Sequence, residues 1–152
     1  MRYLHKAKRS DYKQWIEGYL LFDEFDRQYR IIAQIRYSTG THIHTDDDPR
    51  VDKNTICQCT GLTAYWTDFE DELHECNVWE YDLLEVDYNG KKVIAEVKYE
   101  GGMFILASNK FVDSYIPLFD VVQIEDECWV DAKVIGNIFD NQDLLEETSN
   151  HD

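Results

Sequence analysis

The dipeptide Asn89-Gly90 separates two stretches in which apolar and polar residues alternate, residues 82–88 and residues 91–99. Asn-Gly between alternating stretches is a strong signal for a two-residue β-hairpin turn, because both residues tolerate the positive φ that the turn needs. Gly101-Gly102 then turns the chain into the apolar residues 103–107. We therefore predict three consecutive antiparallel strands, a meander, in the centre of the chain.

Further strands are expected on both sides of the meander. Residues 15–22 and 29–35 are rich in aromatic and branched side chains, and residues 23–28 between them have the composition of a hairpin loop. A short strand is predicted over 55–59, ended by Thr60-Gly61, and one or two more strands over 120–130. A final strand is predicted over 133–139, in which Gly136 marks a bulge or a close backbone approach. Residues 140–147 should form a capped helical turn that then frays.

This pattern predicts a mostly β fold with minor α content, a small SH3-like β-barrel built from antiparallel hairpins. At 152 residues we expect a single domain. Its sub-regions would be an N-terminal hairpin and loop over 1–50, the barrel over 54–140 and a frayed acidic tail over 141–152. Residues 63–77 fit either a helix, because apolar residues recur at helical spacing, or a mobile acidic loop.

The net charge of −16 comes from 31 acidic and 15 basic residues, and it is unevenly distributed. Residues 1–13 hold five basic side chains and one acid, whereas residues 120–152 hold ten acids and one base. A field of this sign repels nucleic acid and membrane surfaces, so direct nucleic-acid binding is disfavoured. The acids then serve solubility, or else form a surface that mimics nucleic acid and occupies a basic partner site.

Nothing in the chain predicts a signal peptide or a membrane span. The basic residues at the start are not followed by an apolar stretch, and no run approaches the roughly 18 apolar residues of a membrane helix. We expect a cytoplasmic protein with Cys57, Cys59, Cys76 and Cys128 as free thiols.

Zinc is the main alternative to a protein without cofactors. The pairs His42-x-His44, Cys57-x-Cys59 and His74-x-Cys76 combine thiolate and imidazole, which zinc prefers. Common structural zinc sites, however, space their cysteines two to four residues apart. The run Asp46-Asp47-Asp48 could hold Ca²⁺ or Mg²⁺, but no EF-hand framework follows it. We therefore predict no metal and no cofactor.

No catalytic motif is present. The chain lacks a nucleophile elbow, a phosphate-binding glycine loop and a His-Glu-x-x-His motif. His74 could activate Cys76, but the acids around it would raise the pKa of the thiol instead. We expect no enzymatic activity, no small-molecule substrate and no catalytic, metal or cofactor residues.

Three stretches in order resemble the YopX family of phage and prophage proteins. They are Lys8-Arg9-Ser10-Asp11-Tyr12-Lys13-Gln14-Trp15-Ile16-Glu17-Gly18-Tyr19-Leu20, then Asp52-Lys53-Asn54-Thr55-Ile56-Cys57-Gln58-Cys59-Thr60-Gly61-Leu62 with Trp79-Glu80-Tyr81-Asp82-Leu83-Leu84, and Val134-Ile135-Gly136-Asn137-Ile138-Phe139-Asp140-Asn141-Gln142-Asp143-Leu144-Leu145. The chain departs from the family at Tyr81, where glycine is usual, at Cys59, where an aromatic is usual, and at Gln142, where proline is usual. Its insert between Leu62 and Trp79 is also longer and more acidic.

The resemblance implies a mostly β protein without an assigned activity or cofactor, whose shared residues serve architecture. Together with the absence of catalytic motifs, it favours a non-enzymatic interaction or oligomeric scaffold protein. The aromatic side chains, Trp15, Tyr19, Tyr65, Trp66, Trp79, Tyr81 and Trp129 among them, would pack in the core or form a self-association surface. The alternatives are an acidic inhibitor that mimics nucleic acid, and a metal-binding protein or unrecognised enzyme.

Overall fold

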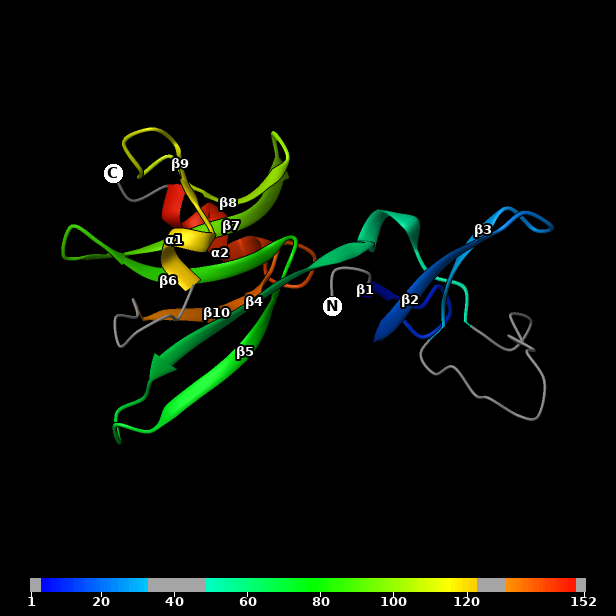
Figure 1. Cartoon of the computed structure of the whole chain (residues 1–152), viewed down its shortest axis with the longest axis horizontal. Helices are drawn as coiled ribbons and strands as arrows, with labels where there is room; N and C mark the ends of the chain where they lie inside the picture. Colours follow the sequence, from blue (N-terminus) through cyan, green and yellow to red (C-terminus); the bar gives the residue numbers. More distant parts are fainter. Residues whose placement is uncertain (1–3, 33–48, 123–130, 150–152) are drawn as a thin grey trace. The chain divides into compact units, whose positions relative to one another are not determined.

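The computed structural model describes residues 4–32, 49–122 and 131–149, without the side chains of 146–149 (Figure 1). The chain divides into two compact units, Met1–Cys59 and Thr60–Asp152, which we call unit 1 and unit 2. Each unit has its own cluster of buried apolar side chains. The two are described separately below.

Unit 1 is a small antiparallel sheet. Its strands are β1 (Leu4–Lys8), β2 (Trp15–Asp23) and β3 (Gln28–Ile32), followed by a short 3₁₀ turn, η1 (Lys53–Thr55), and the first residues of β4 (Cys57–Thr67). β2 pairs with both β1 and β3, and β1 also pairs with the start of β4. Ala7, Ile31 and Val51 form the buried core. The hairpin predicted over 15–35 is confirmed as far as Ile32, whereas β1 was not predicted.

Unit 2 contains the rest of β4 and a second sheet. After β4 come β5 (Leu73–Trp79), β6 (Asp82–Tyr88), β7 (Lys91–Glu100), β8 (Met103–Ala107), β9 (Tyr115–Pro117), α1 (Phe119–Val122), β10 (Ala132–Asn137) and α2 (Gln142–Ser149). The second sheet has the order β10-β6-β7-β8-β9, and all its pairs are antiparallel.

The predicted meander is confirmed as β6, β7 and β8. Asn89 and Gly90 have φ values of 52° and 79°, the pair of positive angles that the hairpin turn needs. The faces also follow the alternation, because Val86, Val93 and Val97 all lie in the buried core. A regular alternation on both sides of the Asn-Gly turn was thus sufficient to predict the first hairpin, and the Gly101-Gly102 turn added the third strand.

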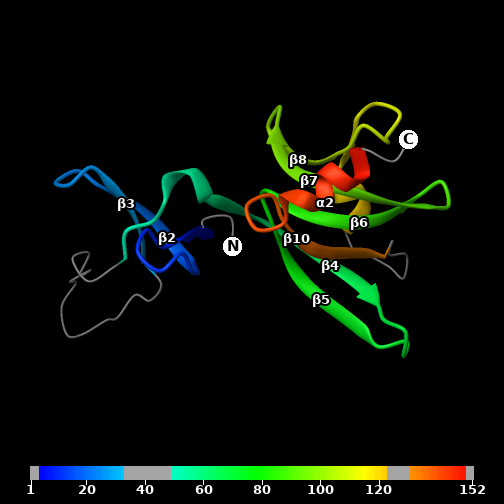
Figure 2. The same ribbon diagram turned by 180° about the vertical axis from the view of Figure 1, so that it is seen from behind.

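Residues 63–77 form no helix: β4 and β5 pair there as a long hairpin, and only residues 68–72 form a turn between the strands. β4 also continues through Gly61, which has φ 76°, so Thr60-Gly61 does not end the strand as predicted. In Figures 1 and 2 the closed end of this hairpin projects beyond the other described strands of unit 2. Ala64 and Val78, nearer its base, lie in the core of unit 2.

The two helices cover opposite faces of the second sheet (Figures 1 and 2). Val121 and Val122 of α1 pack into the core on one face. α2 contacts β7, and its Leu145 lines a groove with Glu96 and Lys98 on the other face. Residues 119–122 are therefore helical where a strand was predicted from Asp120, and residues 123–130 lie outside the described part. The helical turn predicted over 140–147 is confirmed as α2.

The mostly β prediction is confirmed. The described strands form two five-stranded sheets, β3-β2-β1-β4-β5 and β10-β6-β7-β8-β9, and no closed barrel is found among them. In the parts of the chain that the structure describes, no helix has the length and apolar character that crossing a membrane requires.

Candidate functional site

The charge of the chain belongs almost entirely to unit 2. Unit 1 has ten basic and nine acidic residues, a net charge of +1, whereas unit 2 has five basic and 22 acidic residues, a net charge of −17. An acidic part of a chain attracts basic partners, and a basic part attracts acidic partners. Among the described residues, each unit has a place where several charged side chains without a hydrogen-bond or ion-pair partner lie beside an exposed aromatic ring.

The first place is the closed end of the β4–β5 hairpin, residues 68–72, which we call the hairpin tip. The backbone N–H groups of Glu70 and Glu72 donate to Asp68 Oδ1 over 2.8 and 3.0 Å. The N–H of Asp71 donates to the Asp68 carbonyl over 3.1 Å, and Asp71 has φ 59°. These bonds hold the turn in one conformation.

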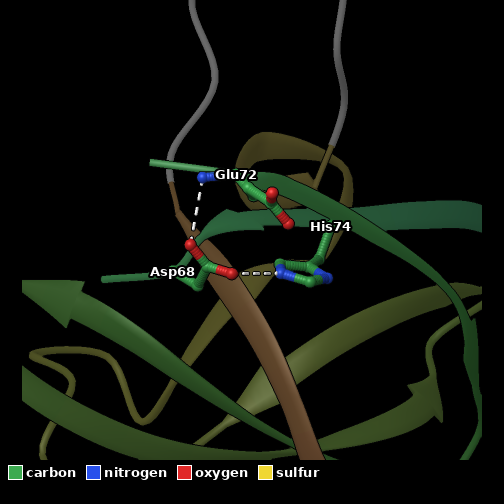
Figure 3. Close-up of side chains that lie close together, drawn as sticks. All are labelled: Asp68, Glu72 and His74. Atoms are coloured by element: carbon green, nitrogen blue, oxygen red, sulfur yellow. Dashed lines mark hydrogen bonds and ion pairs between the residues drawn. The ribbon is translucent and has the colours of Figure 1, made fainter. Parts of the chain in front are cut away.

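The other carboxylate oxygen of Asp68 fastens the tip to β5. Asp68 Oδ2 lies 2.7 Å from His74 Nε2 (Figure 3). The His74 ring stacks on Trp66 with the ring centroids 5.5 Å apart. The hydrogen bond from His74, aided by the two backbone N–H groups, lowers the pKa of the Asp68 carboxyl below its ordinary value.

Asp68, Glu72 and His74 could in principle hold a metal ion, since one ligand atom of each lies within 4.8 Å of the others. However, Asp68 Oδ2 and His74 Nε2 are already bonded to each other, and the His74 side chain is 42% exposed. A cation would have to replace that bond in a site open to water. The direct role of the group is to close the hairpin.

The histidine and cysteine pairs that were weighed as an alternative zinc site are not brought together in the described residues. The group of Asp68, Glu72 and His74, found among those residues, includes no cysteine. Cys57 and Cys59 are buried in β4, and Cys57 Sγ donates to the Thr55 carbonyl. His42, His44, Asp46-Asp47-Asp48 and Cys128 lie outside the described residues. Cys76 Sγ donates to the carbonyl of Asn77 over 3.3 Å.

The outer side chains of the tip have no partners. In the described structure, the carboxylates of Glu70, Asp71 and Glu72 take part in no hydrogen bond or ion pair. Phe69, which precedes them in the turn, is fully exposed. Aromatic side chains are enriched at protein interfaces, so an exposed ring on a turn with a fixed conformation favours a surface that docks into a partner.

The second place is a groove in unit 1 with a volume of about 400 Å³, which we call the basic groove. It is lined by Ser10, Lys13, Phe22, Arg27, Gln28, Tyr29, Val51, Asp52, Lys53 and Asn54. Phe22 and Tyr29 form an aromatic pair with the ring centroids 5.0 Å apart. In the described part of the chain, the side chains of Lys13, Arg27 and Lys53 have no hydrogen-bond or ion-pair partner.

Other basic side chains of unit 1 are already engaged. Arg30 is buried against Asp23 and Asp26, at 3.2 and 2.6 Å. Arg50 shares Asp26 at 3.1 Å, and Arg9 pairs with Asp11 at 2.8 Å. Lys6 and Lys8 lie over the Trp15 ring, so among the described basic side chains of unit 1 those without a partner are at the groove. Sequence reasoning missed the groove, because its three cations come from separate turns and no local motif connects them.

The residues that resemble a known family build the architecture. Asn137 Oδ1 accepts hydrogen bonds from the N–H groups of Phe139 and Asp140, and the N–H of Asn141 donates to the Asn137 carbonyl. This network turns the chain from β10 into α2. Tyr81, which replaces a usual glycine, has φ 70° and packs its ring edge-on against Phe139 at 5.6 Å.

Comparison with known proteins agrees with this resemblance. The model of the YopX protein family matches residues 5–146, nearly the whole chain. No curated protein and no solved structure gives a significant match. The chain therefore belongs to the YopX family.

Proposed function

We propose that this YopX protein is a non-enzymatic interaction module, encoded by a phage or prophage and acting in the cytoplasm of the bacterial host. It works by oligomerisation or by binding a protein partner. The observation that supports this most is the pair of charged surfaces without partners, the hairpin tip in unit 2 and the basic groove in unit 1. Complementary charges on exposed surfaces increase the rate and the specificity of association.

Light scattering on the purified chain, together with a pull-down from host lysate, tests the proposal. The expected result is a mass above the 18.1 kDa of one chain, or a specific protein partner retained after washing. A monomer at every concentration that also retains no partner would contradict it. A catalytic turnover found with any substrate would contradict the non-enzymatic part.

The charge of unit 2 favours a second candidate function, an acidic inhibitor that mimics nucleic acid. A net charge of −17 on residues 60–152 suits the binding site of a basic, nucleic-acid-handling protein. Captured partners should then bind duplex DNA or RNA and be displaced from the chain by it. Capture that added nucleic acid leaves unchanged would exclude this mechanism.

A further inference from the structure

We propose that the hairpin tip of one copy docks into the basic groove of a second copy, so that the chain associates head to tail. This inference rests on the proposed function, because it identifies the partner surface as a second molecule of the same chain. The two surfaces match in three respects: charge, an exposed aromatic ring that fits a groove, and the fixed shape of the tip.

The charges match in sign and in availability. Glu70, Asp71 and Glu72 are the unpaired acids of the tip, and the groove carries three unpaired cations, Lys13, Arg27 and Lys53. The groove also holds one acid, Asp52, whose Oδ1 accepts the Asn54 N–H. None of the six has to leave an existing ion pair among the described residues before it engages a partner. Attraction between such groups weakens as added salt screens it over the Debye length, about 10 Å at 0.1 M.

The apolar parts match as well. Phe69 is fully exposed at the tip, so it has no contact to lose when it enters a partner. The groove offers about 400 Å³, and one side of it is the pair of Phe22 and Tyr29. Phe22 itself is 46% exposed, and aromatic rings prefer the tilted or offset contacts that such a pair can extend.

The tip is shaped before it binds. The bonds of Asp68 to two backbone N–H groups and to His74 hold residues 68–72 in one turn. A segment that is already ordered loses less conformational entropy when it docks. In the groove, Lys13 and Arg27 lie at left-handed turn positions, each with φ 58°. This backbone conformation sets the direction in which each side chain leaves the turn.

A second copy is the partner that the charges favour. Every chain carries both complementary surfaces. The net charge around each surface favours the same pairing, because the tip belongs to the strongly acidic unit 2 and the groove belongs to unit 1, which is not acidic. Because the tip and the groove are different surfaces, each contact joins two unlike surfaces, so association can close as a reciprocal dimer or a ring, or continue as an open chain of subunits.

The first experiment measures mass by light scattering at ionic strengths of about 0.05 M and about 0.5 M. Wild type is expected above 18.1 kDa at low salt and nearer to it at high salt. The groove variant Lys13→Glu/Lys53→Glu and the tip variant Phe69→Ser/Glu70→Lys/Glu72→Lys should each be monomeric. These residues are exposed, so the variants should fold, which circular dichroism verifies.

Matched controls separate the two surfaces from charge in general. Lys91→Glu/Lys133→Glu reverses two exposed lysines of unit 2 and should associate like wild type. Glu100→Lys/Asp113→Lys reverses two exposed acids away from the tip and should also leave association intact. If the controls abolish association as strongly as the groove and tip variants, nonspecific attraction explains it and the proposal is wrong.

Mixing the two defective variants gives the decisive result. The groove variant keeps an intact tip, and the tip variant keeps an intact groove, so an equimolar mixture should associate although neither variant associates alone. The reversed charges on the other two surfaces are also complementary and add to this association. A mixture that stays monomeric overturns the inference. So does a wild-type oligomer that the groove and tip variants leave unchanged, although that oligomer would still agree with the proposed function.

Discussion

The side chain of Asn141 fills the space beside Gly136 in which any other residue would carry its Cβ. Three atoms of Asn141 would lie closer than 3.0 Å to a Cβ at Gly136. Asn141 Oδ1 also accepts a hydrogen bond from the Asn137 N–H over 3.2 Å. The bulge of β10 and the start of α2 are therefore built as one unit, and the predicted close approach at Gly136 is confirmed.

Gly136→Ala should lower the free energy of unfolding by about 2 kcal/mol, because the new methyl group overlaps a side chain that is held in place. Urea denaturation measures it. Gly101→Ala is the matched control: it lies at φ 60° with nothing within 4 Å of the added Cβ, so it should cost only about 1 kcal/mol. Asn141→Gly should reduce the additional cost of Gly136→Ala in a double-mutant cycle; purely additive effects would show that Asn141 is not the obstacle.

Asp82→Ala should be among the most destabilising polar substitutions in unit 2. Its carboxylate is 2% exposed and accepts the Trp79 backbone N–H over 2.8 Å, so removing it leaves a buried donor unpaired. We expect a loss of about 2 kcal/mol in the free energy of unfolding, measured by urea denaturation. Asp87→Ala in the same strand removes only the exposed pair with Lys92 at 3.0 Å and should cost well under about 1 kcal/mol. Equal effects of the two substitutions would contradict this account.

Arg30→Lys should lower the midpoint of thermal unfolding by about 5 °C. The buried guanidinium bonds Asp23 and Asp26 at once, and a single ammonium group cannot reproduce that planar arrangement. Arg50→Lys tests the same change on an exposed side chain that contacts only Asp26 among the described acids, and it should leave the midpoint nearly unchanged. The inference would fail if both variants melted together with wild type.

Asp68→Asn should destabilise the protein at neutral pH and lose this effect in acid. The pKa of Asp68 is lowered, first by the hydrogen bond from His74 and then by the backbone N–H groups of Glu72 and Glu70. A carboxyl whose pKa is lower in the folded state adds stability above its unfolded pKa, and this is lost as the pH falls through the folded pKa. The difference between the melting temperatures of wild type and variant should therefore shrink with falling pH. Asp71→Asn, in the same turn, is the control and should leave the melting temperature at neutral pH nearly unchanged, because the Asp71 carboxylate accepts no hydrogen bond in the described structure.

The sequence predicted those elements in which alternation and turn chemistry agree, as around Asn89-Gly90. It failed at residues 63–77 because two of the four apolar residues that suggested a helix, Phe69 and Leu73, are exposed at the end of a hairpin. Gly61 was predicted to end a strand, but β4 continues through it despite its positive φ. β1 escaped prediction because Ala7 is its only fully buried residue.

The candidate surfaces differ in how far the sequence reveals them. The acids of the hairpin tip are contiguous, so the sequence identified residues 63–77 as an acidic insert, although not as a hairpin. The basic groove depends on Lys13, Arg27 and Lys53, which lie on separate turns of unit 1. The sequence does not show which cations are available to a partner. The structure does, because it pairs Arg9, Arg30 and Arg50 with acids.

The division of charge between the units means that the isoelectric point of about 4.5 describes neither of them. At neutral pH a positively charged surface attracts residues 60–152 and has almost no net pull on residues 1–59. On an anion-exchange resin or an amine-coated sensor, the chain should therefore adsorb through the acids of unit 2. Immobilisation of this kind would block the hairpin tip, so binding assays that need both surfaces should keep the chain in solution or attach it through unit 1.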